Sequence, residues 1–179
     1  MSALERAVLA IRPGVALRAL AVHDDEVVLT GGDEVFRLPL QPTGSARLAV
    51  LVKLLPQLRT RLPVAVAVPR FIGLLPDGET PFTAEPLLPG EPAARQLSPI
   101  ARGQLAGVLA ALADVPPRLA QQLGVAGEGT MLHGALDGTA LLLDPARGVL
   151  TGVVGWRPRL GDPADDLAAL PEAVRAALG

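Results

Sequence analysis

The chain has 179 residues, half of them apolar, with a net charge of −2 and no cysteine. This length suffices for one domain with a substantial core or for two small lobes. The small net charge gives no general attraction to nucleic acid or to an anionic membrane, and the lack of cysteine excludes disulfides and thiolate chemistry. No leader pattern or membrane-length apolar run is present, so we expect a cytoplasmic protein that binds neither nucleic acid nor membrane.

The first half of the chain is typical of an antiparallel sheet with helices. Residues 2–11 have helical spacing and end before Pro13-Gly14, and residues 45–61 repeat leucine and valine at helical intervals. Pro56 is expected to bend or restart the second helix. Turn residues punctuate a series of strand-like runs. The runs expected as strands are 15–22, 26–30, 34–40, 64–68, 70–75 and 81–88.

The periodicity changes after residue 90. Ser98-Pro99 is an N-cap followed by proline at the first helical position, and Pro116-Pro117 is expected to close that helix. Short β runs at 140–143 and 149–154 form a hairpin, and Asp162-Pro163 begins a last helix that Pro171 interrupts. We therefore expect an α+β protein whose residues 1–90 form an amino-terminal lobe and whose residues 91–179 form a mainly helical lobe with a small hairpin.

Three segments of the second half carry family-like motifs. The aminoglycoside/macrolide phosphotransferase family has the patterns H-G-D-L-x-x-x-N-v-L-v-D, G-v-I-D-W and G-D-P-x-x-D-L-A, and this chain resembles it at all three. The matching segments are His133-Gly134-Ala135-Leu136-Asp137-Gly138-Thr139-Ala140-Leu141-Leu142-Leu143-Asp144, Thr151-Gly152-Val153-Val154-Gly155-Trp156 and Gly161-Asp162-Pro163-Ala164-Asp165-Asp166-Leu167-Ala168. The resemblance implies a protein-kinase-like two-lobe fold.

The chain departs from the family at the residues that perform the chemistry. Ala135 stands where the family has its catalytic Asp, Ala140 where it has a Mg²⁺-binding Asn, and Gly155 where it has the second metal-binding Asp. The resemblance therefore implies no catalytic residue, no metal ligand and no cofactor. Asp137 is a candidate substitute for the lost Asp, but its carboxylate would have to reach from a different backbone position.

Arg37 matches the cation that holds the phosphates of ATP in the family, within Val35-Phe36-Arg37-Leu38-Pro39. No acidic residue lies between Val35 and Pro76, so the helix at 45–61 cannot supply the family's Glu partner. The carboxylates of the turn at 23–26 are expected to repel a polyphosphate. Arg37 either retains an anion contact or extends its guanidinium to solvent. The cations between Arg37 and Arg70 form either a solvated basic face or a surface for an acidic partner; they are Arg37, Arg47, Lys53, Arg59, Arg61 and Arg70.

Four residues of the motifs are expected to be structural. The resemblance implies that His133, with Gly134, supports the backbone of the loop and that Asp166 braces this loop from below. Asp162 is expected to cap the last helix, since proline follows it.

The resemblance and its departures leave three functional hypotheses. The first is a catalytically inactive, truncated relative that acts as a binding, regulatory or assembly module. The alternatives are a minimal ATP- and Mg²⁺-dependent small-molecule phosphotransferase and a non-catalytic binder of a small ligand. Because few elements would remain to cover the apolar stripes of the last helix and of the helix that begins at Ser98, we also expect a homodimer packed through the carboxy-terminal lobe, besides a possible protein partner.

Overall fold

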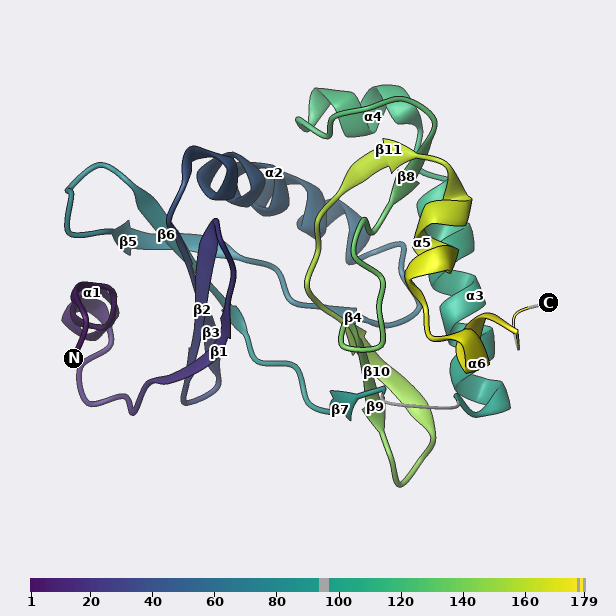
Figure 1. The fold of residues 1–179 in the computed structure, drawn as a ribbon, viewed down its shortest axis with the longest axis horizontal. Coiled ribbons are helices and arrows are strands. Elements are labelled where there is room, and N and C mark those ends of the chain that lie inside the picture. The colour runs from purple at the N-terminus through teal and green to yellow at the C-terminus, as the bar shows by residue number, and fades with distance from the viewer. Residues whose placement is uncertain (94–96, 177, 179) are drawn as a thin grey trace. The chain divides into compact units, whose positions relative to one another are not determined.

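The computed structural model describes residues 1–93, 97–176 and 178, and Figure 1 shows it as a ribbon. The chain divides into two compact units: unit 1 comprises Met1–Lys53 and Val68–Leu87, and unit 2 comprises Leu54–Ala67 and Leu88–Gly179. The change after Leu87 lies near the expected boundary at residue 90. Residues 54–67, however, group with unit 2 rather than with the amino-terminal lobe.

Unit 1 contains a five-stranded antiparallel sheet in the order β1-β2-β3-β6-β5. Its strands are β1 (Arg18–Val22), β2 (Glu26–Gly31), β3 (Glu34–Pro39), β5 (Arg70–Leu74) and β6 (Pro81–Pro86). The turns between the first three strands produce the hairpins that the sequence predicts. β6 pairs with β3, so strands far apart in the sequence become neighbours.

The helix α1 (Ala3–Ile11) packs on one face of this sheet. It begins at a capping box, in which the Ser2 hydroxyl accepts from the Glu5 N–H and the Glu5 carboxylate accepts from the Ser2 N–H. Because side chains alternate along a strand, apolar residues gather on the face toward α1. The buried residues of this cluster are Val8, Leu29, Phe36, Leu38, Leu75, Phe82 and Ala84.

The long helix α2 (Pro42–Leu58) carries the repeated leucines. It begins at Pro42 rather than at residue 45, and it ends in the turn that contains Pro56 instead of restarting beyond it. The strand expected at 64–68 is shorter than predicted and belongs elsewhere. Only Ala65–Val66 (β4) is a strand, and it pairs in parallel with β10 (Val149–Val153) of unit 2.

Unit 2 combines two small sheets with four helices among its described residues. The sheets have the orders β4-β10-β9-β7 and β11-β8. The further strands are β7 (Glu91–Pro92), β8 (Thr130–Leu132), β9 (Leu141–Asp144) and β11 (Arg159–Gly161); the helices are α3 (Pro99–Ala113), α4 (Pro117–Gln122), α5 (Pro163–Ala169) and α6 (Glu172–Arg175). The sequence did not predict α4, β8 or β11. The helix α3 ends at Ala113, before Pro116-Pro117, as expected. Pro117 is in addition the first residue of the short helix α4.

The helices of unit 2 bury the apolar stripes that the sequence shows. Leu105, Val108 and Leu112 of α3 are buried, as are Leu170 and Val174 at the end of the chain. The expectation that few elements remain to cover the stripes is therefore wrong for these residues, whereas Leu109 and Leu167 stay partly exposed. No helix in the described part of the chain is both long and apolar enough to span a membrane.

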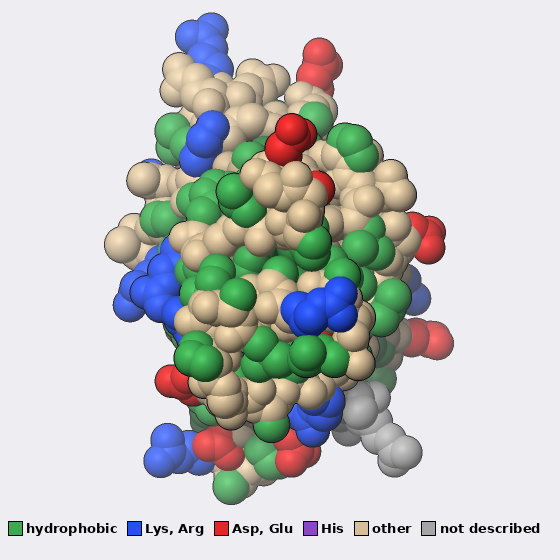
Figure 2. Space-filling model, turned by 90° about the vertical axis from the view of Figure 1, so that its left-hand side faces the viewer, with side chains coloured by type: hydrophobic (Ala, Val, Ile, Leu, Met, Phe, Trp, Pro, Cys, Tyr) green, Lys and Arg blue, Asp and Glu red, His purple; other side chains and the backbone are tan. Residues whose placement is uncertain are grey.

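Large apolar side chains that stay exposed lie mainly in unit 1. Figure 2 shows one face of the molecule, on which hydrophobic side chains form several groups between polar ones. The exposed large hydrophobic residues of unit 1 are Met1, Leu20, Val22, Leu40, Phe71, Leu74 and Leu87, whereas the described part of unit 2 contributes only Ile100.

Candidate functional site

The loop that follows β8 is held by a carboxylate from α5. The two oxygens of Asp166 accept hydrogen bonds from two successive backbone N–H groups, those of His133 at 2.7 Å and Gly134 at 2.9 Å. This bidentate contact satisfies two donors that the loop would otherwise bury unpaired. Asp166 is 2% exposed, and burial raises the pKa of its carboxyl group above the ordinary value, against the opposing effect of these hydrogen bonds. The contact fixes the backbone at the start of the loop.

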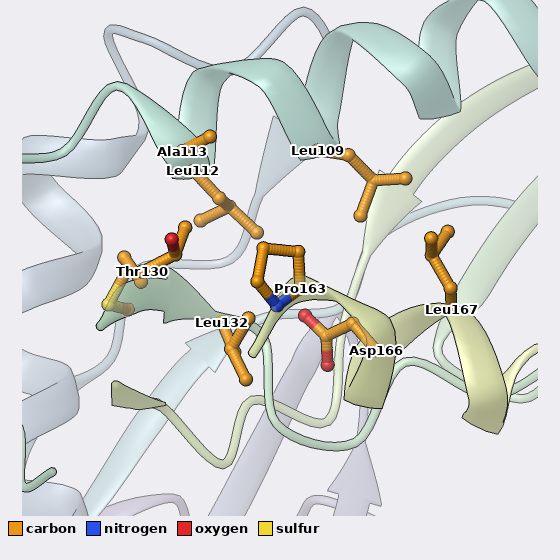
Figure 3. Close-up of a pocket in the computed structure, with 9 residues that line it drawn as sticks. Leu109, Leu112, Ala113, Thr130, Leu132, Pro163, Asp166 and Leu167 are labelled. Atoms are coloured by element: carbon orange, nitrogen blue, oxygen red, sulfur yellow. The ribbon is translucent and has the colours of Figure 1, made fainter. Parts of the chain in front are cut away.

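Asp166 also lines a small cavity of about 80 Å³ in unit 2 (Figure 3). The other walls come from α3, β8 and the start of α5, and they are mostly apolar. The labelled lining residues in Figure 3 are Leu109, Leu112, Ala113, Thr130, Leu132, Pro163, Asp166 and Leu167. This apolar surrounding is the physical source of the desolvation that acts on the carboxylate of Asp166.

The imidazole of His133 supports the same loop from inside the unit. Its Nε2 lies 3.0 Å from the carbonyl oxygen of Val154, and the Ala135 N–H donates to its Nδ1 at 3.3 Å. Since Nδ1 accepts, this network assigns the proton to Nε2. His133 is fully buried, and burial lowers its pKa from 6.5 to about 4. The ring is therefore neutral at physiological pH and acts as a structural bridge between two loop segments.

Gly134 and Gly155 occupy backbone positions that favour glycine. Gly134 has φ +82°, and a Cβ there would collide with the carbonyl oxygen of Arg157. Gly155 has φ +75°, but the space around it is open. At Gly155 the missing carboxylate is thus accompanied by a backbone conformation that most other residues adopt only with strain.

Positions 135 and 140 also lack polar side chains, and the nearby carboxylate of Asp137 is hydrogen-bonded within a turn. Ala135 is half-buried and Ala140 is 3% exposed. One oxygen of Asp137 accepts from the Thr139 N–H at 2.8 Å, the Thr139 hydroxyl at 2.6 Å and the Ala140 N–H at 3.1 Å. Although burial opposes it, these hydrogen bonds hold the pKa of Asp137 below its ordinary value. Asp137 therefore stabilises the turn rather than projecting free from it.

No group of three or more His, Cys, Asp or Glu side chains that could hold a metal ion occurs among the described residues.

Asp162 is the N-cap of α5, with its side chain accepting from the Ala164 N–H at 2.9 Å. Trp156 is buried and donates from Nε1 to the Val153 carbonyl oxygen at 3.1 Å. Its ring packs against that of His133 at a tilt of 45°, with ring centroids 4.3 Å apart. Both residues thus stabilise the loop region of unit 2.

Arg37 of unit 1 is held by two carboxylates of its own sheet. Its Nη1 lies 2.9 Å from Oε1 of Glu26 on β2, and its Nη2 lies 2.9 Å from Oε1 of Glu85 on β6. The side chains of the two glutamates are 2% and 5% exposed, and that of Arg37 is 12% exposed. The guanidinium therefore does not extend to solvent, which was one of the two alternatives that the sequence left open.

Arg47 of α2 extends this network. It pairs with Asp25 and, through Nη2 at 3.2 Å, with Oε2 of Glu26. Asp25 and Glu26 are therefore paired with arginines rather than free, and the expected repulsion of a polyphosphate by the turn stays a prediction. The expected basic face is reduced as well: Arg37 and Arg47, whose side chains are 12% and 13% exposed, are held in ion pairs, and Arg70 pairs with Glu34 at 3.4 Å.

The sequence did not predict the carboxylate partners of Arg37, because they lie on neighbouring strands and not in the following helix. The register places Arg37 opposite Val28 of β2 and Thr83 of β6. Glu26 and Glu85 stand two residues along these strands, on the same face and within diagonal reach of a long side chain. The alternation of side chains in the three strands was the signal that could have identified them.

Comparison with known proteins shows where this architecture occurs. By sequence, the chain matches no protein-family model and no curated protein. Its structure is similar to that of an APH(2″) enzyme in a complex with GDP and kanamycin, at a TM-score of 0.82 and 19% identity, over 97% of this chain and 80% of that one. It is also similar to the apoenzyme of the macrolide 2′-phosphotransferase MphH from Brachybacterium faecium, at a TM-score of 0.76 and 23% identity over the same shares of the two chains.

A third similar structure is a ternary complex of APH(2″)-IIa with streptomycin and ATP, with a TM-score of 0.66 and 12% identity, covering 89% of this chain and 72% of that one. The antiparallel sheet of unit 1 and the helices and hairpin of unit 2 agree with the expected α+β class. The sequence resemblance is thereby confirmed at the level of the fold: this chain has the protein-kinase-like fold of the aminoglycoside and macrolide phosphotransferases.

Proposed function

We propose that the protein is a catalytically inactive, phosphotransferase-like module that acts by binding, in regulation or in assembly, and needs neither ATP nor Mg²⁺. The observation that carries the proposal is the absence of a carboxylate or amide side chain at Ala135, Ala140 and Gly155. The carboxylate of Asp137, which lies near Ala135, does not replace the lost catalytic Asp, because it accepts hydrogen bonds within its own turn. We place this function in the cytoplasm.

The side chains missing at positions 135, 140 and 155 are the ones that phosphoryl transfer requires. The reaction depends on positioning and on electrostatic stabilisation of charge, which active enzymes supply through metal-binding side chains and one carboxylate at the acceptor hydroxyl. Unit 2 retains the support of the loop through His133 and Asp166 but not these groups. In unit 1, the guanidinium of Arg37 already contacts Glu26 and Glu85. Both observations support a retained scaffold without the chemistry.

We expect no Mg·ATP binding of physiological strength. Neither Ala140 nor Gly155 offers a ligand for the metal, and Arg37 would have to exchange two buried carboxylates for phosphate. Isothermal titration with millimolar Mg·ATP is the measurement, and it should show no binding heat beyond dilution. A Kd in the low micromolar range would show that the proposal is wrong.

Restoring a single residue is not expected to restore activity. Ala135→Asp returns the carboxylate at the acceptor hydroxyl but leaves the metal without ligands, and such interdependent groups act as a unit. A coupled assay with kanamycin or a macrolide should give the same ATP turnover for the variant and the wild type. Antibiotic-dependent turnover by Ala135→Asp alone would show that the metal is held by another route.

The alternative function is a minimal ATP-dependent phosphotransferase acting on an aminoglycoside- or macrolide-type hydroxyl. It is favoured only by the structural similarity to enzymes whose complexes contain kanamycin with GDP or streptomycin with ATP. A thermal-shift assay distinguishes the hypotheses. Stabilisation by nucleotide supports the enzyme, stabilisation by the antibiotic alone supports a non-catalytic ligand binder, and no shift supports the proposed module.

A homodimer packed through unit 2 remains a prediction. Most of the stripe residues of α3 and of the last helices are buried, so the contact would have to use other residues. Ile100 of α3, which is 60% exposed, is the large exposed apolar side chain among the described residues of unit 2. Ile100→Ser is expected to raise the dimer dissociation constant by about tenfold, as removal of a buried apolar anchor costs on the order of 1–2 kcal/mol. Light scattering at micromolar concentration measures this, and a wild-type monomer of 18.4 kDa would exclude the dimer.

A further inference from the structure

Among the buried carboxylates of the described residues, Asp166 stands apart because no ion pair neutralises it. The buried glutamates of unit 1, Glu26 and Glu85, both pair with an arginine. Asp166 is 2% exposed and accepts hydrogen bonds from two backbone N–H groups instead. The charge of Arg159 acts on it, but this guanidinium pairs with Asp165 at 2.9 Å, and the charge of Asp165 has the opposite effect. Since buried charges are normally paired, a cation beside Asp166 would be favourable.

The hydrogen bonds of Asp166 leave room for further donors. Its Oδ2 accepts from the His133 N–H and its Oδ1 accepts from the Gly134 N–H. An ionised carboxylate has about four acceptor positions, two on each oxygen. Each oxygen of Asp166 can therefore accept a donor from a ligand while it keeps its contact with the loop.

The cavity that Asp166 lines provides the space for such a ligand. It has a volume of about 80 Å³, and its lining side chains other than Asp166 and Thr130 are apolar. In Figure 3 the carboxylate points towards Leu132 and Pro163, which line the cavity with it. A cavity of about 150 Å³ holds benzene, so this one is large enough for about three or four non-hydrogen atoms.

The apolar walls favour an organic cation over a metal ion. A hard metal ion such as Ca²⁺ requires about six or more oxygen ligands, whereas the side chains of this lining offer only Asp166 and Thr130. An ammonium group needs only hydrogen-bond acceptors, and a short alkyl group on it gains free energy by leaving water for an apolar wall. The leucines of the lining supply that wall; they are Leu109, Leu112, Leu132 and Leu167.

We propose that the cavity lined by α3, β8 and α5 binds a short-chain primary alkylammonium ion, which donates to Asp166 and places its alkyl group against the leucines. The site goes beyond the proposed function, because it uses no side chain at positions 135, 140 or 155 and requires neither nucleotide nor metal. Since Asp166 also holds the backbone N–H groups of His133 and Gly134, the ligand acts on the start of the loop that carries Ala135.

Titration of the full chain with isopropylammonium chloride, followed through its amide NMR spectrum, tests the proposal. The amide signals of His133 and Gly134 should shift saturably with a Kd of about 1 mM, which is within the limit for so small a ligand. Isopropanol has a similar size and shape without the charge, and ammonium chloride has the charge without the alkyl group. Both should bind at least about tenfold more weakly at equal ionic strength.

Matched variants of α3 locate the site. Leu109 lines the cavity and is partly exposed, so Leu109→Phe can place a larger side chain in the cavity and should raise the Kd about tenfold or more. Ile100→Phe changes an exposed residue of the same helix outside the lining and should keep the wild-type Kd. Asp166→Asn should abolish binding. If this variant does not fold, Leu109→Phe and the comparison with isopropanol still test the site, because both keep the carboxylate of Asp166.

Equal affinity for isopropanol and isopropylammonium would overturn the proposal, as would an unchanged Kd in Leu109→Phe. The absence of a saturable shift at about tenfold excess over the expected Kd would overturn it as well. None of these results depends on the titration with Mg·ATP. Micromolar nucleotide binding would contradict the proposed function but would not change the expected binding of the alkylammonium ion, so the two failures are distinguishable.

Discussion

Arg37→Met is expected to lower the free energy of unfolding by about 3–5 kcal/mol, the cost of leaving one side of a buried ion pair uncompensated. Glu85, 5% exposed, would lose the guanidinium that neutralises it, and Glu26 would keep only Arg47. Burial already raises the pKa of Glu85 above its ordinary value, against the attraction of Arg37. Urea unfolding at pH 7, with the slope m compared between variant and wild type, measures the loss.

The double variant Arg37→Met/Glu85→Gln tests whether this loss comes from the uncompensated charge of Glu85. It removes both charges of the pair, so its loss should be clearly smaller than that of Arg37→Met, about 1–2 kcal/mol. Arg70→Met serves as a matched control, because Arg70 is 71% exposed and its pair with Glu34 should contribute about 0.5 kcal/mol or less. A loss for Arg37→Met as small as that of Arg70→Met would show that the network contributes little to stability.

The free energy of unfolding is expected to fall by about 3 kcal/mol between pH 7 and pH 4 because of the titration of His133. Its pKa is lowered by burial from 6.5 to about 4, so the unfolded chain takes up a proton in this window while the folded chain resists it. A lowered histidine pKa therefore contributes stability that is present above pH 6.5 and is lost toward pH 4. The measurement is the free energy of unfolding in urea at several pH values across this range.

Comparison with His133→Gln isolates this contribution. Glutamine keeps an N–H donor near the Val154 carbonyl but does not titrate, so the stability difference between wild type and variant should shrink by about 3 kcal/mol over the window. The comparison is needed because burial raises the pKa values of Asp166 and Glu85, which changes stability in the opposite direction. His23→Gln, at an exposed turn, should keep the wild-type profile. A parallel decline of His133→Gln and wild type would contradict the assignment.

The sequence by itself determined the features that depend on neighbouring residues. Ser2, Ser98 and Asp162 mark the starts of α1, α3 and α5, because a capping side chain needs only the first helical turn. The hairpins β1–β2 and β2–β3 follow from their turns in the same way. The motif from His133 to Asp144 and the block around Asp162 indicated the fold, which the structural similarities confirm.

The local sequence pattern did not predict the short strands β8 and β11 or the pairing of β4. β8 and β11 have three residues each, too few to show a periodicity, and they pair with each other across the sequence. Ala65 and Val66 looked like part of a longer strand of the first sheet, but β4 pairs with β10 of unit 2. A strand's partner depends on long-range contacts, which a local pattern of alternation does not contain.

The tertiary structure also decided the state of Arg37. The family resemblance implied a cation at a phosphate site, and the lack of an acid in the following helix showed only that this helix supplies no partner. The register of β2, β3 and β6 instead places Glu26 and Glu85 beside it, from positions 11 residues before and 48 residues after it in the sequence. Whether a charge is paired or solvated depends on which side chains folding brings within a few ångströms, and that information lies in the sheet rather than in any local motif.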